Sequence, residues 1–271
     1  VATGSNYPDA LTAAPAAAKA GAPLLLVPAN SIPDSVRTEI QRLRPAEIIV
    51  VGGPASVTPA VFDALAQLTT TISRDSGSDR YEASRNVALH AFSAGAGVAY
   101  IATGETFPDA LSASAAAGSI GAPVILINGL LTTLDSATMD LISQLGVTDI
   151  RIAGGPASVR PELEAQMSTI AGVTSVRRLS GPDRFYVSGN TNRDAFASSS
   201  RVYLASGWNY PDALSGAAVA GAQHAPLYVI PTDCIPSYVI QDIISLGATR
   251  MTVLGGPASV SPGVLRFAQC R

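Results

Sequence analysis

The stretch ATGETFPDALSAS at residues 102–114 decides the fold, because two further copies occur in the chain, ATGSNYPDALTAA at 2–14 and ASGWNYPDALSGA at 205–217. The shared PDAL places Asp9, Asp109 and Asp212 at spacings of 100 and 103 residues. Each copy leads from a strand-like segment through a proline into an Ala-rich run typical of a helix. A repeat of this length predicts three copies of one structural unit.

Two further motifs follow the same period. GGPASV stands at 52–57, 154–159 and 255–260, whereas SG-x-DR occurs only twice, as SGSDRYEAS at 76–84 and SGPDRFYVS at 180–188. Each SG-x-DR precedes the next ATG or ASG, so it opens a unit. We therefore expect repeat units at residues 1–72, 73–176 and 177–271, the first of them without its leading SG-x-DR segment.

Within a unit, short Val- and Ile-rich runs alternate with helical patterns. This alternation predicts an α/β fold, in which parallel strands are joined by crossover helices and each sheet is covered by helices on both faces. In the middle unit the strands are expected at 98–102, 123–127 and 149–155, and the helices at 108–121, 134–146 and 161–170.

Composition narrows the function classes. Of the 271 residues, 47% are hydrophobic and 14% charged, so the chain can bury a large core. A net charge of -3 argues against a broad basic surface for nucleic acid or an anionic membrane. No apolar run approaches the roughly 20 residues needed to span a bilayer, so no membrane insertion is expected.

The two cysteines, Cys234 and Cys270, allow two interpretations. In a cytosolic protein they would be separately buried thiols. In an extracellular protein they would form a disulfide that closes a loop of about 35 residues.

The aspartates of PDAL (Asp9, Asp109 and Asp212) are the first candidate site residues. Aspartate is a favoured N-cap and suits the positive end of the helix dipole, so a helix-capping role is the simplest interpretation. The alternatives are direct contact with a ligand and a hydrogen bond between repeats.

GGPASV follows a strand-like run in every unit. Its two glycines allow a tight turn, and the motif is interpreted either as a strand–turn–helix connector or as a nest of backbone N–H groups that holds an anion. The candidate ligand-binding residues of this motif are Gly53, Ser56, Gly155, Ser158, Gly256 and Ser259.

SG-x-DR also resembles a helix start, with Ser76 or Ser78 as the cap and Asp79 in the first turn. The guanidinium groups of Arg80 and Arg184 would then oppose the helix dipole. Each arginine therefore needs a partner, which is either a carboxylate on another element or an anionic ligand.

No catalytic arrangement accompanies these residues. His90 and His224 do not occupy matching positions, and the sequence contains no HExxH, CxxC or GxSxG motif. Neither a cofactor nor a metal is predicted. Features repeated in every unit suit a binding module better than an enzyme, whose chemistry would gather at one asymmetric site.

Taken in order, SGxDRY, ASGxNYPDALSGA, APLYVIP and VLGGPASVSP resemble the cell-wall-binding repeat type 2 family of Gram-positive surface proteins. The resemblance covers nearly the whole chain. It implies Toprim-like α/β repeats packed in a pseudo-threefold triangle, with binding in the grooves between repeats. It also implies an extracellular, S-layer-like anchor that binds an anionic secondary cell-wall polymer, such as a polysaccharide or a teichoic-acid-like chain.

Three functions remain open on this basis. The chain is expected to be a non-catalytic anchor, with Arg80, Arg184 and the N–H groups of the GGPASV turns contacting phosphate or carboxylate. One alternative is the wall-targeting part of an autolysin or peptidase whose catalytic domain lies elsewhere. The other is a surface scaffold or adhesin that binds a protein partner.

Overall fold

The computed structural model describes residues 1–270, which form three parallel sheets. The strand orders are β2-β1-β3-β4, β6-β5-β7-β8 and β10-β9-β11. The strands are β1 Ala2–Thr3, β2 Leu26–Val27, β3 Glu47–Val51, β4 Thr71–Asp75, β5 Val98–Thr103, β6 Val124–Ile127, β7 Asp149–Ala153, β8 Ser175–Leu179, β9 Arg201–Ser206, β10 Leu227–Ile230 and β11 Arg250–Val253. The predicted α/β class with parallel sheets is confirmed, whereas the likeness to a Toprim fold stays a prediction.

The three sheets share one pairing register. In each, the strand that leads into PDAL (β1, β5 or β9) ends opposite the last residue of the strand that follows it in the chain (β2, β6 or β10). These pairs are Thr3 with Val27, Thr103 with Ile127, and Ser206 with Ile230. Since all strands within a sheet run the same way, the loops that carry PDAL and GGPASV leave from the same edge. Two motifs far apart in the sequence are therefore brought together in each unit.

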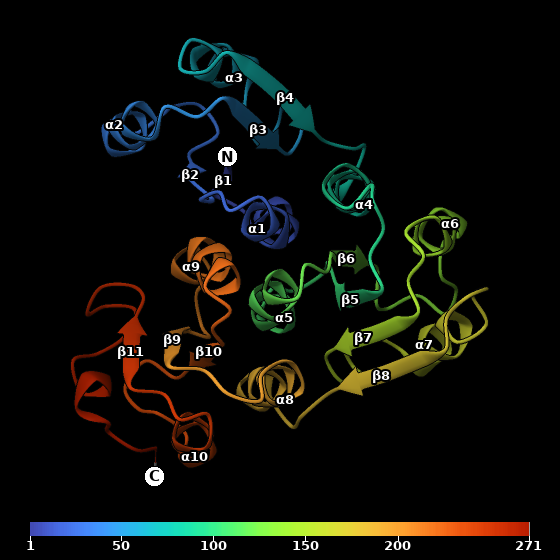
Figure 1. Cartoon of the computed structure of the whole chain (residues 1–271), viewed down its shortest axis with the longest axis vertical. Coiled ribbons are helices and arrows are strands. Elements are labelled where there is room, and N and C mark those ends of the chain that lie inside the picture. The colour runs from blue at the N-terminus through green and yellow to red at the C-terminus, as the bar shows by residue number, and fades with distance from the viewer. Residues whose placement is uncertain (271) are drawn as a thin grey trace.

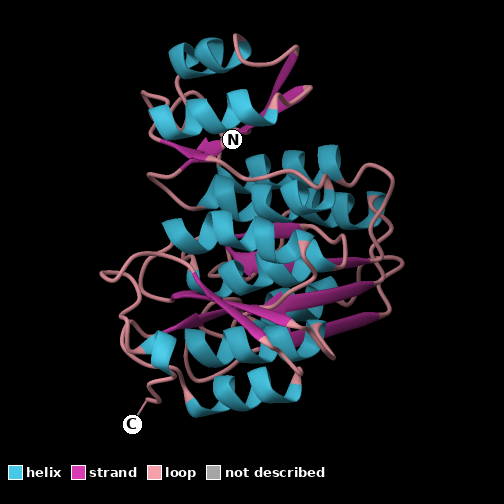
Figure 2. Ribbon diagram, turned by 60° about the vertical axis from the view of Figure 1, so that its left-hand side comes forward, coloured by secondary structure: helices cyan, strands magenta, loops and turns pink. Residues whose placement is uncertain are grey.

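Ten α-helices connect and cover the sheets over the described residues. They are α1 Pro8–Lys19, α2 Asp34–Leu43, α3 Pro59–Ala66, α4 Arg80–Ala91, α5 Pro108–Ser119, α6 Ser136–Gln144, α7 Pro161–Met167, α8 Arg184–Ala195, α9 Pro211–Ala222 and α10 Ser237–Ser245, with a short 3-10 helix at Val264–Arg266. The three PDAL helices α1, α5 and α9 pack against one another at the centre, and the sheets lie around them (Figure 1). Figure 2 shows the resulting layers of helices and strands. None of the helices of residues 1–270 is both long enough and apolar enough to cross a bilayer.

Helices α4 and α8, which carry SG-x-DR, join neighbouring units. Helix α4 follows the first sheet and packs on α1 and β6, and α8 follows the second sheet and packs on α5 and β10. The unit boundaries at 72/73 and 176/177 stay predictions. Both positions fall inside strands, β4 and β8, that pair with the preceding sheet.

The central helices approach closely because their contact faces are made of small residues. Every residue of α5 is buried. A Cβ added at Gly118 would lie 2.8 Å from the Cβ of Ala18 and 3.3 Å from the Cα of Gly221. The three helix C-terminal halves therefore touch through alanine and glycine, and no larger side chain fits between them.

We expect Gly118→Leu to lower the free energy of unfolding by at least about 2 kcal/mol, because overpacking outweighs the gain in helix propensity. Denaturant unfolding followed by circular dichroism measures this loss. The control is Gly97→Leu, since a Cβ at Gly97 meets no atom within 4 Å. Equal stabilities of the two variants would show that the central contact tolerates larger side chains.

Two capping predictions are wrong. The PDAL helices begin at proline, so their N-cap residues are Tyr7, Phe107 and Tyr210, and the aspartate stands one residue inside the helix. In SG-x-DR the cap is the aspartate rather than a serine. The Asp79 carboxylate accepts hydrogen bonds from the amides of Tyr81 and Glu82, both at 2.8 Å, and Asp183 caps α8 in the same way. Proline at the first helical position places the cap two residues before the aspartate, and the tertiary structure then uses the PDAL carboxylate elsewhere.

The third sheet ends differently from the other two. After β11 the described chain forms no fourth strand, and it runs back to the segment before α10. There Ile235 forms a parallel bridge with Gln269, and Cys234 is joined to Cys270 by a disulfide. Of the two interpretations of the cysteines, the structure shows the paired one.

Candidate functional site

Each unit contains a cluster made of the PDAL aspartate with the first glycine and the serine of GGPASV, which we call the Asp–Gly–Ser cluster. In the middle unit the Ser158 hydroxyl donates a hydrogen bond to Oδ2 of Asp109 at 2.7 Å. Gly154, with φ +118°, lies directly behind the carboxylate, since a Cβ there would stand 2.5 Å from Oδ2. Only glycine combines this backbone conformation with so close an approach.

The same arrangement recurs in the other two units. The first unit joins Asp9, Gly52 and Ser56, and the third joins Asp212, Gly255 and Ser259. The aspartate therefore ties the PDAL helix to the turn after β3, β7 or β11. The GGPASV motif is confirmed as a strand–turn–helix connector, and the predicted ligand contacts of Asp9, Asp109 and Asp212 stay predictions.

Burial raises the pKa of the aspartate in the clusters of the first and middle units. Removal from water raises the pKa of Asp109, which is 7% exposed, although the Ser158 hydrogen bond and the charge of Arg184 lower it in part. The pKa of Asp9 is raised for the same reason and is lowered in part by Ser56 and Arg80. A raised carboxyl pKa indicates that the ionised form is poorly solvated and benefits from a nearby cation.

Arg80 and Arg184 supply that positive charge from the next SG-x-DR helix. Both side chains are half-buried between two units. Nη1 of Arg80 donates to the carbonyl of Gly104 at 2.5 Å, and Nη1 of Arg184 donates to the carbonyl of Gly207 at 2.8 Å. Neither forms an ion pair within 4.0 Å of a carboxylate among the described residues, so the predicted salt bridge is replaced by a bond to backbone. Each arginine thus spans the junction of two units and keeps further N–H donors.

The third junction, at Asp212 and Gly4, differs from the other two because SG-x-DR occurs only twice in the given sequence. Asp212 belongs to a complete Asp–Gly–Ser cluster, and Gly4 stands where Gly104 and Gly207 stand in the other junctions. No SG-x-DR arginine of the given sequence corresponds to this junction.

Most backbone donors of the GGPASV turns are already used. The amide of Ser158 donates to the carbonyl of Gly155 at 2.9 Å, and the equivalent bonds of Ser56 to Gly53 and of Ser259 to Gly256 are also 2.9 Å. The amides of Gly53, Gly155 and Gly256 make no such backbone bond among the described residues. If these turns hold an anion, the amides of the second glycine and of the alanine are the donors that remain, rather than the serine amide.

The aromatic residue before PDAL was missed by the motif reasoning. The rings of Tyr7, Phe107 and Tyr210 contact one another at the centre, with centroid distances of 5.7, 5.6 and 5.3 Å. The Tyr7 hydroxyl also donates to the carbonyl of Glu105 at 2.7 Å. An aromatic residue at the same place in all three copies was the signal that could have found this triad.

Trp208 is a second residue that the motifs did not indicate. It is 58% exposed, and its ring lies 4.9 Å from the guanidinium of Arg184 and 5.2 Å from the ring of Phe185. The junction of the second and third units therefore combines an arginine with an accessible aromatic surface.

Comparison with known proteins agrees with the threefold division. The sequence profile of the family described as Cell wall binding domain 2 (CWB2) matches residues 1–62, 74–164 and 178–265. The N-acetylmuramoyl-L-alanine amidase LytC of Bacillus subtilis is 27% identical over 96% of this chain and 51% of its own length. The Amidase enhancer of the same organism is 28% identical over 94% of this chain and 34% of its own.

Solved structures show the same architecture. Cwp8 from Clostridium difficile superposes with a TM-score of 0.86 and 26% identity over 98% of this chain and 45% of Cwp8. Cwp6 from the same organism gives 0.86 and 25% over 94% of this chain and 41% of Cwp6. The chain thus spans about half the length, or less, of the relatives it matches. Because the family profile covers most of the chain in three successive matches, this protein belongs to the Cell wall binding domain 2 (CWB2) family and is a cell-wall-binding module of the cell surface.

Proposed function

We propose that the chain is a non-catalytic module that anchors a surface protein noncovalently to an anionic secondary cell-wall polymer. The observation that carries this proposal is the placement of Arg80 and Arg184. Each lies at a junction of two units and donates to a backbone carbonyl, without a carboxylate in ion-pair distance among the described residues. A guanidinium held in this way presents its other N–H groups for a phosphate or carboxylate of the polymer.

The overall charge of -3 does not oppose this binding. Surface charges more than about 10 Å apart are largely screened at 0.1 M salt, so the local cation decides the interaction with an anionic group. Two such sites on one rigid module, facing a polymer that repeats its own groups, gain avidity from effective concentration.

The serines of the Asp–Gly–Ser clusters support a non-catalytic role. Ser158 donates to Asp109, which is an arrangement for holding a turn rather than for activating a nucleophile through an imidazole. The two histidines lie elsewhere, since His90 contacts Asp75 at 3.0 Å and His224 contacts the carbonyl of Ser119 at 2.7 Å.

Replacing both arginines, Arg80→Ala with Arg184→Ala, is expected to weaken binding to purified wall polymer at least tenfold, since a charged hydrogen bond contributes about 1.5–3 kcal/mol. Binding is measured by co-sedimentation with walls and by titration of the soluble polymer. Arg42→Ala with Arg250→Ala is the matched control, because it removes two exposed arginines. Unchanged polymer binding of the Arg80/Arg184 variant would sink the proposal.

Two measurements make that result specific. The melting temperature of each variant separates loss of binding from loss of folding, because Arg80 and Arg184 also tie units together. Walls stripped of secondary polymer with acid identify the ligand. Loss of sedimentation with stripped walls supports the polymer, and retained sedimentation supports a peptidoglycan or protein partner.

A second proposal concerns the longer protein. The match to LytC, of which this chain covers 51%, favours a role as the wall-binding part of a longer wall protein, such as an autolysin. The binding chemistry proposed above is the same in that case. The full-length gene product decides between this role and a surface scaffold.

A further inference from the structure

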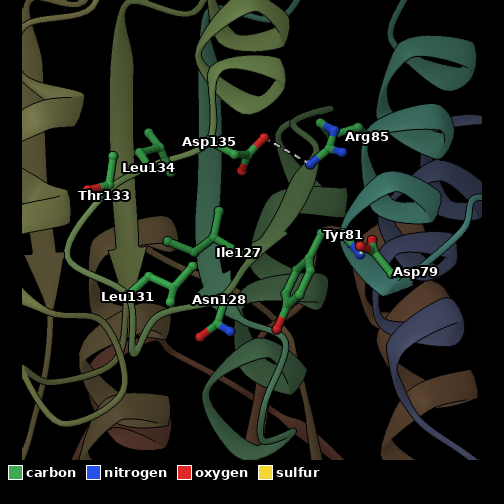
Figure 3. Close-up of a pocket in the computed structure, with 9 residues that line it drawn as sticks. All are labelled: Asp79, Tyr81, Arg85, Ile127, Asn128, Leu131, Thr133, Leu134 and Asp135. Atoms are coloured by element: carbon green, nitrogen blue, oxygen red, sulfur yellow. Dashed lines mark hydrogen bonds and ion pairs between the residues drawn. The ribbon is translucent and has the colours of Figure 1, made fainter.

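The middle unit contains a cavity of about 210 Å³, which is lined by residues of the SG-x-DR helix α4 and of the segment from β6 to α6. Figure 3 shows Tyr81 and Arg85 of α4 on one side, and Asn128, Leu131 and Asp135 from the segment between β6 and α6 on the other. Ile127, the last residue of β6, lies between the two groups. At roughly 30 Å³ for each water, this volume corresponds to about seven waters, which is room for one sugar ring rather than for an oligosaccharide.

A longer loop distinguishes the middle unit from the other two. The backbone carbonyls of Ala29, Gly129 and Thr232 accept equivalent bonds from the residues that follow GGPASV, and they mark the same position in the three units. From that position the next helix begins five residues later in the first and third units, at Asp34 and Ser237, but seven residues later in the second, at Ser136. The extra length contains Leu130 and Leu131, which are 52% and 53% exposed.

In the third unit aromatic side chains stand on the equivalent helices, α8 and α10. The rings of Tyr186 and Tyr238 are stacked there with their centroids 4.3 Å apart. Gly189 of α8 stands at the position of Arg85 in α4, and a Cβ at Gly189 would lie 3.1 Å from the Tyr238 ring. The second unit has Ala137 at the position of Tyr238. The second and third units thus differ in the side chains that stand between these two helices.

The charges around the cavity disfavour an anion. Among the residues that line it, all of them described, Arg85 is the cation, and it is paired with Asp135 at 3.1 Å. The carboxylate of Asp79 is also part of the lining, so the formal charge of the lining is negative. A phosphate or carboxylate would meet these acids, whereas a neutral ligand meets no such penalty.

The remaining groups suit a ligand that carries both an amide and a methyl group. Oδ1 of Asn128 accepts a hydrogen bond from the amide of Leu130 at 3.1 Å, whereas its Nδ2 group has no protein partner among residues 1–270. Beside it lie the apolar side chains of Ile127 and Leu131 and the ring of Tyr81. An amide donor next to an apolar wall matches the carbonyl and the methyl of an acetamido group, and an aromatic ring suits the apolar face of a pyranose.

We propose that this cavity binds one neutral N-acetylated hexosamine residue. The inference rests on the proposed wall-binding function, since such a residue would be part of a wall glycan. It adds a site of different chemistry, because the arginine junctions bind charged groups whereas this cavity binds an uncharged sugar.

The test is a titration of the ¹⁵N-labelled chain with three methyl glycosides, those of N-acetylglucosamine, N-acetylgalactosamine and N-acetylmannosamine, each beside its parent hexose. At least one N-acetylated sugar is expected to shift the Asn128 side-chain amide and the Leu130–Leu131 amides saturably. The parent hexose is expected to bind at least about tenfold more weakly, since it lacks the groups that the cavity recognises. No saturable shift with any of the three, or equal binding of sugar and parent, overturns the proposal.

Matched variants locate the binding. Leu131→Ala, which removes a lining side chain, is expected to weaken binding about threefold or more, and Leu130→Ala, its exposed neighbour outside the lining, is expected to leave it unchanged. Arg85→Gly with Ala137→Tyr introduces the residues of the third unit at these two positions, so that a tyrosine ring stands beside α4, and it is expected to abolish the shifts with the chain still folded. Persistence of the shifts in this double variant places the sugar elsewhere and overturns the proposal.

The outcome is separable from that of the anchor proposal. The monosaccharide titration uses no polymer, and the Arg80→Ala/Arg184→Ala variant is expected to keep saturable sugar binding while it loses the polymer. If the sugars fail to bind but the arginine variant still loses the polymer, only the cavity proposal falls. If the sugars bind but the arginine variant keeps the polymer, only the anchor proposal falls.

Discussion

Replacing both cysteines, Cys234→Ser with Cys270→Ser, is expected to lower the free energy of unfolding of the third unit by about 4 kcal/mol. This is the stabilisation that the chain-entropy model gives for a disulfide-closed loop of this length. The disulfide joins residues 36 apart in sequence. It holds a terminal segment that has few other ties, namely the bond from the Ile235 amide to the Ala268 carbonyl at 2.7 Å and that from the Cys270 amide to the Ile235 carbonyl at 3.0 Å. The unpaired outer side of β11 makes this tie more important than it would be in the first two units.

Denaturant unfolding followed by the fluorescence of Trp208 measures this effect, because Trp208 is the single tryptophan and lies in the third unit. The unaltered protein in reductant is expected to match the double variant, and the variant itself is expected to be insensitive to reductant. A loss below about 1 kcal/mol would mean that the unfolded chain is already restricted without the disulfide.

Gly154→Ala is expected to destabilise the protein by about 3 kcal/mol. A non-glycine residue at φ +118° costs about 1–3 kcal/mol, and the added Cβ would stand 2.5 Å from Oδ2 of Asp109. The carboxylate must then move, which breaks its 2.7 Å bond with Ser158 at a further cost of about 1 kcal/mol. Thermal and denaturant unfolding measure the loss.

The neighbouring glycine provides the control. A Cβ at Gly155 meets no atom within 4 Å, and its φ is not in the left-handed region, so Gly155→Ala is expected to change stability by less than about 0.5 kcal/mol. Adding Asp109→Ala to Gly154→Ala removes the overlap between the new Cβ and the carboxylate but leaves the backbone strain. The double variant should therefore lose less stability than the sum of the losses of the two single variants. Additive losses would show that the carboxylate and the glycine are not in contact.

Much of the fold was predictable because repetition amplifies weak local signals. The helix expected at 108–121 is α5 Pro108–Ser119, and the strand expected at 98–102 is β5 Val98–Thr103. Copies of PDAL and GGPASV in constant order also indicated the three units. The ends of helices were less predictable, since aspartate is a favoured cap residue but Asp109 lies two residues beyond the N-cap Phe107.

The site was only partly predictable. Arg80 and Arg184 were recognised as residues in need of a partner, but a backbone carbonyl was not among the partners considered. The aromatic triad was overlooked, because its contacts join residues about 100 positions apart or more. Trp208 was overlooked because it occurs in only one of the three copies. The cavity was invisible for another reason: it depends on differences between units, whereas motif reasoning looks for what units share.

By itself, the sequence determined the period, the parallel α/β unit, the small-residue helices and the family, because these follow from local periodicity and from short motifs repeated in a constant order. Only the tertiary structure decided what the aspartates do, which carbonyls hold the arginines, and where a cavity opens. Those properties arise when parallel strands bring distant loops to one edge and three helices meet at one centre. The PDAL carboxylate thereby lies against a glycine turn some 45 residues away, and no local pattern records that contact.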